Sequence, residues 1–171
     1  MMYRIGLGYD SHPFVHERTL KLGGLEIPFA LGLGGHSDAD VVLHALTDAI
    51  LGAVGQGDIG EQFPDSDPAY HNADSGQFVR QAVAMAAQRG YRVANCDVTV
   101  LAEKPSLREH KPPIRAKIAE LLGVKPDAVS IKAKTNEGMG FVGRSEGIAA
   151  IAVVMVAVDT TGGNEDGHQV I

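Results

Sequence analysis

An unbroken apolar run, residues 147–158 (GIAAIAVVMVAV), constrains the fold of this chain more than any other feature. The run is too short to cross a bilayer, which takes about 20 residues of helix. Alanine is frequent in it, but its length, its unbroken apolarity and its β-branched residues favour a buried strand over a helix. We therefore expect a globular core built around this strand and no segment in a membrane.

The other predicted strands alternate with predicted helices along the sequence. They cover residues 3–10, 92–101 and 129–134, with a hairpin of 20–22 and 25–29 that turns at Gly23-Gly24. The predicted helices begin after Ser37, at Ser75 and near Pro112, and each ends at a glycine: Gly55, Gly90 and Gly123. This alternation predicts a single α/β domain.

The first predicted helix carries an N-terminal signature. Ser37 is the expected N-cap, and Asp40 stands three residues later, at the capping-box position. The polar segment 55–75 after this helix is predicted to be a long loop, and loops of this length inside a compact domain are usually functional. The polar tail, residues 159–171, is expected to be disordered.

Net charge and cysteine content narrow the class of function. The net charge is −6, so no global basic field favours nucleic acid or an anionic membrane as a partner. A phosphate-bearing ligand would have to be held locally, by metals, backbone amides or a few basic side chains. The one cysteine, Cys96, lies in an apolar segment and is expected to be a buried, inert thiol. No secretory signal opens the sequence, so we expect a cytoplasmic protein.

Asp10 and His12 flank one residue at the end of the first strand, so their side chains point to the same side. With His44 on the first helix they make a candidate three-ligand zinc site, which leaves one position open. Asp40 or Asp48, each four residues from His44, could orient its ring. The alternative is that His12 is a turn residue and His44 a hydrogen-bonded core histidine.

Four segments together resemble the 2-C-methyl-D-erythritol 2,4-cyclodiphosphate synthase family. They are residues 4–14 (RIGLGYDSHPF), 35–44 (GHSDADVVLH), 57–68 (GDIGEQFPDSDP) with 73–75 (ADS), and 132–147 (KAKTNEGMGFVGRSEG). The resemblance spans residues 4–158 and implies a single domain over 1–158. It implies a layered α+β fold, with a mixed sheet, helices packed on one face, an N-terminal hairpin and assembly as a homotrimer.

The resemblance also implies the reaction. It is a metal-dependent intramolecular phosphoryl transfer that converts 4-diphosphocytidyl-2-C-methyl-D-erythritol 2-phosphate to 2-C-methyl-D-erythritol 2,4-cyclodiphosphate and releases CMP. Asp10, His12 and His44 match the ligands of one Zn²⁺ per chain. Glu137 matches the position that holds a second divalent ion, Mg²⁺ or Mn²⁺, on the diphosphate. His36 and Thr135 match residues that stabilise the transition state.

Substrate contacts are implied in two separate blocks of the sequence. The sugar phosphate block comprises Ser37, Asp58, Ile59, Gly60, Phe63, Pro64, Asp65, Ser66 and Asp67. The cytidine diphosphate block comprises Ala102, Glu103, Lys104, Pro105, Ser106, Leu107, Arg108, Lys134 and Asn136. The resemblance places these two blocks on neighbouring subunits, and it places Phe141 and Arg144 near a threefold cavity. Ser106 departs from the family, which commonly has lysine there.

Three other interpretations compete with this one. Residues 138–143 spell the dinucleotide-binding motif G-x-G-x-x-G, but that motif requires a helix after it, where a strand is predicted. A purely structural zinc site would usually have four protein ligands, often cysteines. Asp65 and Asp67 suggest a calcium loop, although the rest of that pattern is missing. Arg144 could also simply pair with Glu146.

Overall fold

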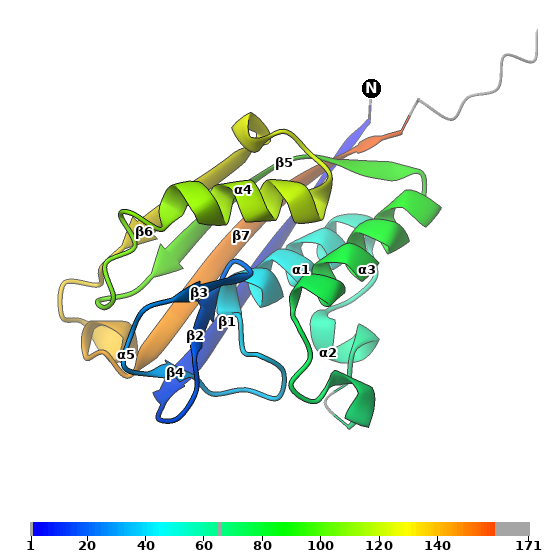
Figure 1. The fold of residues 1–171 in the computed structure, drawn as a ribbon. Helices are drawn as coiled ribbons and strands as arrows, with labels where there is room; N and C mark the ends of the chain where they lie inside the picture. The colour runs from blue at the N-terminus through cyan, green and yellow to red at the C-terminus, as the bar shows by residue number, and fades with distance from the viewer. Residues whose placement is uncertain (1, 65, 160–171) are drawn as a thin grey trace, which may run out of the picture.

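The apolar run forms the strand β7 (Gly147–Val158), which lies in the middle of a five-stranded sheet. The computed structural model describes residues 2–64 and 66–159. Antiparallel pairing joins β7 to β1 (Tyr3–Val15) on one side and to β5 (Tyr91–Leu101) on the other. The sheet is completed by β4 (Gly32–Leu33), antiparallel to β1, and β6 (Val129–Lys134), parallel to β5. The expected mixed sheet is confirmed (Figure 1).

Three helices cover one face of this sheet, as expected: α1 (Val41–Val54), α3 (Gly76–Gln88) and α4 (Lys111–Leu122) (Figure 1). The helix α1 lies directly on β1 because two strand residues that face it are glycines. A Cβ atom on Gly6 or Gly8 would overlap the carbonyl oxygens of Ala49 and Ala45. Backbone therefore meets backbone where α1 crosses β1.

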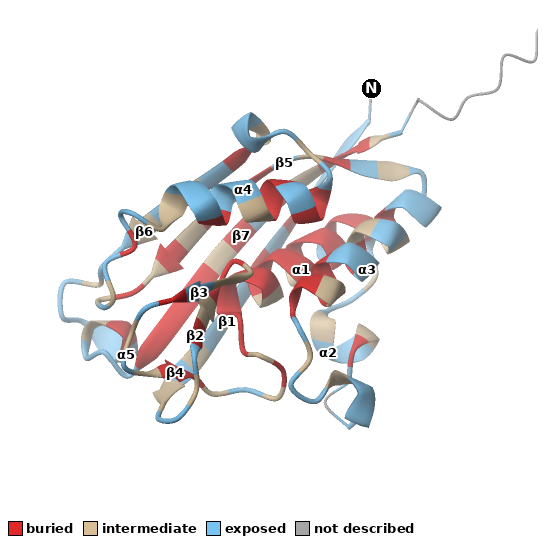
Figure 2. Cartoon of the chain, viewed as in Figure 1, coloured by how far each residue is buried: buried red, intermediate tan, exposed pale blue. Residues whose placement is uncertain are grey.

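The opposite face of the sheet carries large apolar side chains that are open to solvent. Tyr3, Ile5, Leu7 and Tyr9 of β1 are 51–69% exposed, and no helix of the described residues covers them. In Figure 2 the buried residues instead gather where the helices meet the sheet. A continuous exposed apolar row of this kind marks an interaction surface.

The hairpin is confirmed as β2 (Leu20–Leu22) and β3 (Leu25–Ile27), and Gly23 and Gly24 adopt the left-handed φ values of 63° and 82° that its turn requires. The carboxylate of Asp40 accepts hydrogen bonds from both glycine amides, at 2.9 and 2.6 Å. It also accepts from two amides of the first turn of α1, both at 3.1 Å. Asp40 is therefore the N-cap, and the prediction that Ser37 caps this helix was wrong.

The segment 55–75 is not the structureless loop that was predicted. It contains the short helix α2 (Ile59–Gln62) and a 3₁₀ turn, η1 (Pro68–Tyr70). A second 3₁₀ turn, η2 (Pro126–Ala128), precedes β6, and the short helix α5 (Gly140–Gly143) lies in the glycine-rich segment before β7. Since a strand and not a helix follows that segment, the dinucleotide-binding interpretation fails.

Two remaining expectations concern the membrane and the tail. Within residues 2–64 and 66–159, no helix combines the length and the apolarity needed to span a membrane. The predicted disordered tail lies outside the described residues, apart from Asp159, whose amide donates to the carbonyl oxygen of Gly90.

Candidate active site

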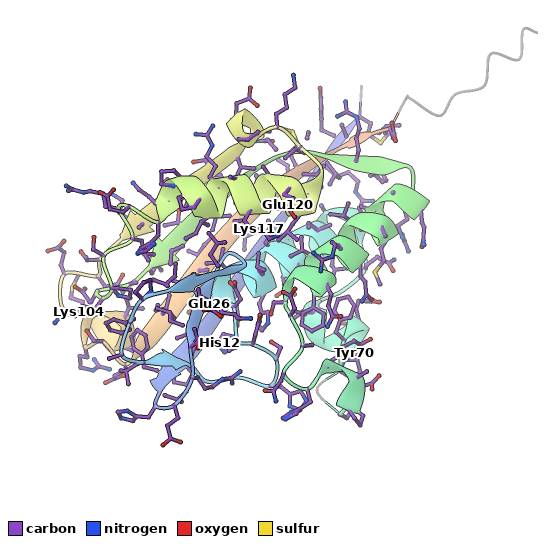
Figure 3. The ribbon with its side chains drawn as sticks, viewed as in Figure 1. His12, Glu26, Tyr70, Lys104, Lys117 and Glu120 are labelled. Atoms are coloured by element: carbon purple, nitrogen blue, oxygen red, sulfur yellow. The ribbon has the colours of Figure 1, made fainter. Side chains whose placement is uncertain are left out.

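Asp10, His12 and His44 meet at the end of the sheet near β4. The strand β1 contributes the first two side chains, and α1 contributes the third; Figure 3 labels His12 there. The Asp10 Oδ2 atom lies 2.9 Å from His12 Nε2 and 3.1 Å from His44 Nδ1, and the two ring nitrogens are 3.0 Å apart. These three atoms form a nearly equilateral triangle, and the group could hold a metal ion.

The electrostatics of the triangle favour an ionised Asp10. Burial opposes ionisation, but hydrogen bonds from His12 and His44, and their positive charge, outweigh it and hold the pKa of Asp10 well below its usual range. A carboxylate that stays ionised among two imidazoles is a donor set suited to a divalent cation.

A cavity of about 260 Å³ opens beside the triangle. Its wall includes the predicted residues His36, Ser37, Ile59, Gly60 and Phe63, together with Tyr70 and Phe78, which the sequence did not single out. The rings of Phe63, Tyr70 and Phe78 pack against one another, with centroids 4.9–5.7 Å apart. This aromatic cluster makes one side of the cavity rigid.

His36 carries a ring nitrogen without a partner. Its Nε2 atom is buried and has no hydrogen-bond partner among the described residues. The ring of His71 lies edge-on at a centroid distance of 5.0 Å. A buried unpaired nitrogen on a cavity wall is a polar group that a ligand can satisfy.

The helix α2 is held in place by two aspartates. Asp58 is its N-cap and accepts from the amide of Glu61 at 2.9 Å. Asp48, on α1, accepts from the amide of Ile59 at 2.7 Å. Burial raises the pKa of Asp48, and this hydrogen bond opposes the rise. The expectation that Asp40 or Asp48 orients His44 was therefore wrong, because each carboxylate accepts backbone amides elsewhere.

Two serine hydroxyls contact the other nitrogen of His44 instead. His44 Nε2 lies 2.9 Å from Ser75 Oγ and 3.0 Å from Ser37 Oγ. Ser75 was expected only as the start of a helix, and its side chain makes no capping bond to α3. The sequence signal that could have revealed this contact is residues 73–75 (ADS), which belong to the third of the four segments that carry the resemblance.

Three further described residues of the predicted sugar phosphate block do not line the cavity. Pro64, Ser66 and Asp67 are exposed, and Asp67 caps η1 through the amide of Ala69 at 2.9 Å. Asp65 lies outside the described residues. These loop residues follow the cavity wall in sequence, directly after Phe63.

A second hollow, of about 390 Å³, gathers most of the predicted nucleotide block. It is lined by Ala102, Glu103, Pro105, Ser106, Leu107, Arg108, Lys111, Ala133, Lys134 and Thr135. No described residue lines both hollows. In Figure 3, Tyr70 of the first hollow and Lys104, within the nucleotide block, lie on opposite sides of the molecule. One chain therefore carries the two predicted halves of the site apart from each other.

The loop beside the second hollow is held by Glu103. Its Oε1 atom accepts from the amides of Asn136 at 2.8 Å and Gly138 at 3.3 Å. The Thr135 hydroxyl donates to Glu137 Oε1 at 2.8 Å. Glu103 thus faces the loop backbone and fixes the segment that presents Thr135 and Glu137.

Phe141 and Arg144 lie near the start of β7 and line neither of these hollows. Phe141 is 38% exposed. The guanidinium of Arg144 pairs with Glu146 at 2.7 Å, and this pairing raises the pKa of Arg144 and lowers that of Glu146. The ion-pair interpretation of Arg144 therefore describes its contacts within one chain.

Comparison with known proteins gives a consistent set of relatives. Residues 3–157 match the YgbB family. A Symbiobacterium thermophilum protein named 2-C-methyl-D-erythritol 2,4-cyclodiphosphate synthase is 58% identical over 153 residues, which cover 90% of this chain and 98% of that protein.

Solved structures agree. A 2C-methyl-D-erythritol-2,4-cyclodiphosphate synthase in a form bound to CDP superimposes with a TM-score of 0.84 at 36% identity, covering 90% of this chain and 100% of the other. The bifunctional IspDF of Campylobacter jejuni gives a TM-score of 0.87 at 41% identity over 91% of this chain, which spans only 42% of the length of that protein.

Proposed function

The chain belongs to the YgbB family, and from this premise we propose that it converts 4-diphosphocytidyl-2-C-methyl-D-erythritol 2-phosphate to the 2,4-cyclodiphosphate, with release of CMP, in isoprenoid precursor biosynthesis. The observation that carries the proposal is the pair of hollows. One adjoins a metal-binding triangle and the other gathers the residues predicted for the nucleotide. The Symbiobacterium thermophilum relative, 58% identical to this chain, carries the name of this activity.

Zn²⁺ is the metal that suits the triangle. Zinc bound tetrahedrally to nitrogen and oxygen at about 2.0–2.1 Å keeps its ligands about 3.3 Å apart. The three ligand atoms here are 2.9–3.1 Å apart, so small adjustments admit the ion. With three protein ligands the site keeps an open position, as catalytic zinc sites do. Glu137, held by Thr135, would carry a second ion, Mg²⁺ or Mn²⁺.

The reaction demands charge neutralisation and in-line positioning more than a strong base. The 2-phosphate oxygen forms a bond to the β-phosphorus, and the bond from that phosphorus to the CMP oxygen breaks, so CMP leaves with the electron pair. Bound metal ions supply charge neutralisation for the phosphates on a chain of net charge −6.

The side chains of the chain do the positioning. Ser37 and the unpaired nitrogen of His36 offer hydrogen bonds to the sugar phosphate end. Asp58, the N-cap of α2 and the residue before the cavity-lining Ile59, would accept from substrate hydroxyls. Thr135 and Lys134 face the nucleotide end. Together they would hold the two reacting phosphates in line.

We also propose that the active enzyme is a homotrimer with each site shared by two chains. Two observations support this assembly. The two hollows of one chain share no described residue, so neither contains the whole constellation. The exposed row of Tyr3, Ile5, Leu7 and Tyr9 offers an apolar face for burial against other copies. Phe141 and Arg144 would then lie near the threefold axis.

The expected cytoplasmic location stays a prediction.

The direct test is incubation of the purified protein with the cytidine diphosphate substrate, Zn²⁺ and Mg²⁺. CMP and the cyclic diphosphate should appear together in equal amounts, and a chelator should stop both. Release of CMP without the cyclic product would indicate a simple hydrolase and would overturn the proposal.

A further inference from the structure

We propose that Ser75 and Asp38 are positioning residues that hold a proton on Nε2 of His44, so that Nδ1 is the ring nitrogen presented to the metal. The inference rests on the metal site of the proposed function. It concerns two side chains that lie behind His44, away from the metal triangle.

Ser75 is fully buried, and its hydroxyl lies between two partners. The Oγ atom is 2.5 Å from Asp38 Oδ1 and 2.9 Å from His44 Nε2. Asp38, Ser75 and His44 come from three different places in the chain: the segment before α1, the residue before α3, and α1 itself. They form a continuous hydrogen-bonded chain that ends at the metal triangle.

The direction of the hydrogen bonds in this chain follows from what each group can donate. A carboxylate only accepts, so the single hydroxyl proton of Ser75 must go to Asp38. The Ser75 oxygen can then only accept from His44, which requires a proton on Nε2. With the Nε2 proton held in this way, Nδ1 is the ring nitrogen left for the metal. Nδ1 is the atom that faces Asp10 and His12.

The surroundings of Asp38 keep it in this accepting role. Its Oδ1 atom also lies 3.3 Å from the amide of Ser75 and 3.4 Å from the amide of Asp40. The Nζ atom of Lys21 lies 3.4 Å from the other carboxylate oxygen, and the Asp38 side chain is only 9% exposed. Every neighbour of Asp38 named here is a donor, so its carboxylate oxygens act as acceptors in each of these contacts.

Ser37 is affected by the same arrangement. Its hydroxyl oxygen is 3.0 Å from His44 Nε2 and accepts the amide of Ala39 at 3.2 Å. Because His44 Nε2 carries a proton that points toward the serine oxygens, Ser37 cannot donate its hydroxyl proton to that nitrogen. Its own proton stays available to Ser75, 3.3 Å away, or to a ligand in the cavity that it lines.

The test uses Ser75→Ala with Thr47→Val as the matched control. Thr47 is also a fully buried hydroxyl residue; it lies on α1 three residues after His44, and it donates only to the helix carbonyl oxygen of Leu43, at 2.8 Å. Two quantities are measured on each folded protein. Long-range ¹H–¹⁵N NMR of the metal-free protein reports which nitrogen of His44 is protonated, with the His44→Gln protein identifying the signal. Competition with a chromophoric chelator gives the zinc affinity.

We expect the wild-type protein and Thr47→Val to show protonated Nε2 and equal zinc affinity. In Ser75→Ala, only the freely rotating hydroxyl of Ser37 faces Nε2, whereas the Asp10 carboxylate still accepts from Nδ1, so protonation of Nε2 should fall. Zinc affinity should fall about tenfold or more, as for other groups that orient metal-bound histidines. Asp38→Ala should do the same, because it frees Ser75 to donate to His44. Asp38→Asn, which keeps an accepting oxygen, should restore most of the loss.

Unchanged tautomer and unchanged zinc affinity in both Ser75→Ala and Asp38→Ala would overturn the inference. If Ser75→Ala does not fold, Asp38→Ala decides the question by the same two measurements. A wild-type protein that binds no zinc would instead refute the metal assignment of the proposed function, and the NMR measurement would still decide whether Ser75 and Asp38 control the His44 proton.

Discussion

Reassembly of two inactive variants would reveal whether the two hollows of one chain serve different sites. His44→Ala damages the metal half, and Thr135→Ala damages the nucleotide half. If each site combines the first hollow of one chain with the second hollow of the next, a mixed trimer regains one intact site. Random mixing of equal amounts makes about three quarters of the trimers mixed, and in each of these about one site in three is intact.

The expected recovery is therefore about a quarter of wild-type activity, by this closed-ring counting. The assay is CMP release after the two variants are unfolded together and refolded, with each variant refolded alone as the control. Subunit exchange is confirmed by mass spectrometry of tagged chains. Activity no greater than the sum of the separate variants, despite confirmed exchange, would show that each site is built within one chain.

Four further predictions follow from individual contacts. Asp48→Ala removes the carboxylate that accepts a hydrogen bond from the amide of Ile59 in α2, worth about 1.5–3 kcal/mol, so KM should rise about 10- to 100-fold while zinc content by elemental analysis stays normal; a loss of zinc would contradict this role. Asp40→Ala leaves four amides without their acceptor and should lower the free energy of unfolding in urea by about 3 kcal/mol or more, whereas an unchanged midpoint would refute the anchoring role. Burial raises the pKa of the Cys96 thiol to about 12, so at pH 8 the folded protein should not react with a thiol reagent that labels it in urea. Leu7→Asp places a charge on the exposed apolar row and should yield folded monomers in sedimentation, with activity lost; persistent trimers would move the interface elsewhere.

The sequence was most informative where local pattern and tertiary pairing agree. The bounds of β6 and β7 were predicted residue for residue, because β6 (VSIKAK) alternates apolar and polar residues and β7 is an unbroken apolar run rich in β-branched residues. In contrast, β1 continues past Asp10 to Val15. Residues 11–15 (SHPFV) lack a strand pattern. They are held by pairing with β7, where His12 lies opposite Ile148, and with β4. Register with a distant strand cannot be read from the local sequence.

The same dependence on distant parts of the chain decides which residues of the candidate site could be predicted. The three candidate metal ligands could be proposed from residue type and spacing, and the structure brings them together. The contact of Ser75 with His44 could not be predicted from the sequence, because Ser75 lies 31 residues further along the chain and approaches His44 only after α3 packs beside α1. Asp40 was noticed at its capping position, yet its bonds to the hairpin turn depend on a contact 16 and 17 residues away.

The contact of α1 with β1 through Gly6 and Gly8 has a consequence for how such a sequence can change over time. Asp10 follows Gly8 by two residues, and His44 precedes Ala45, whose carbonyl oxygen faces Gly8. The gap between these two candidate metal ligands is therefore fixed by main-chain atoms, which every substitution leaves in place. Substitutions of core side chains elsewhere can accumulate during evolution while the distance between the ligands stays the same. Even the methyl group of an alanine at Gly8 would push α1 away from β1 and so separate the candidate metal ligands.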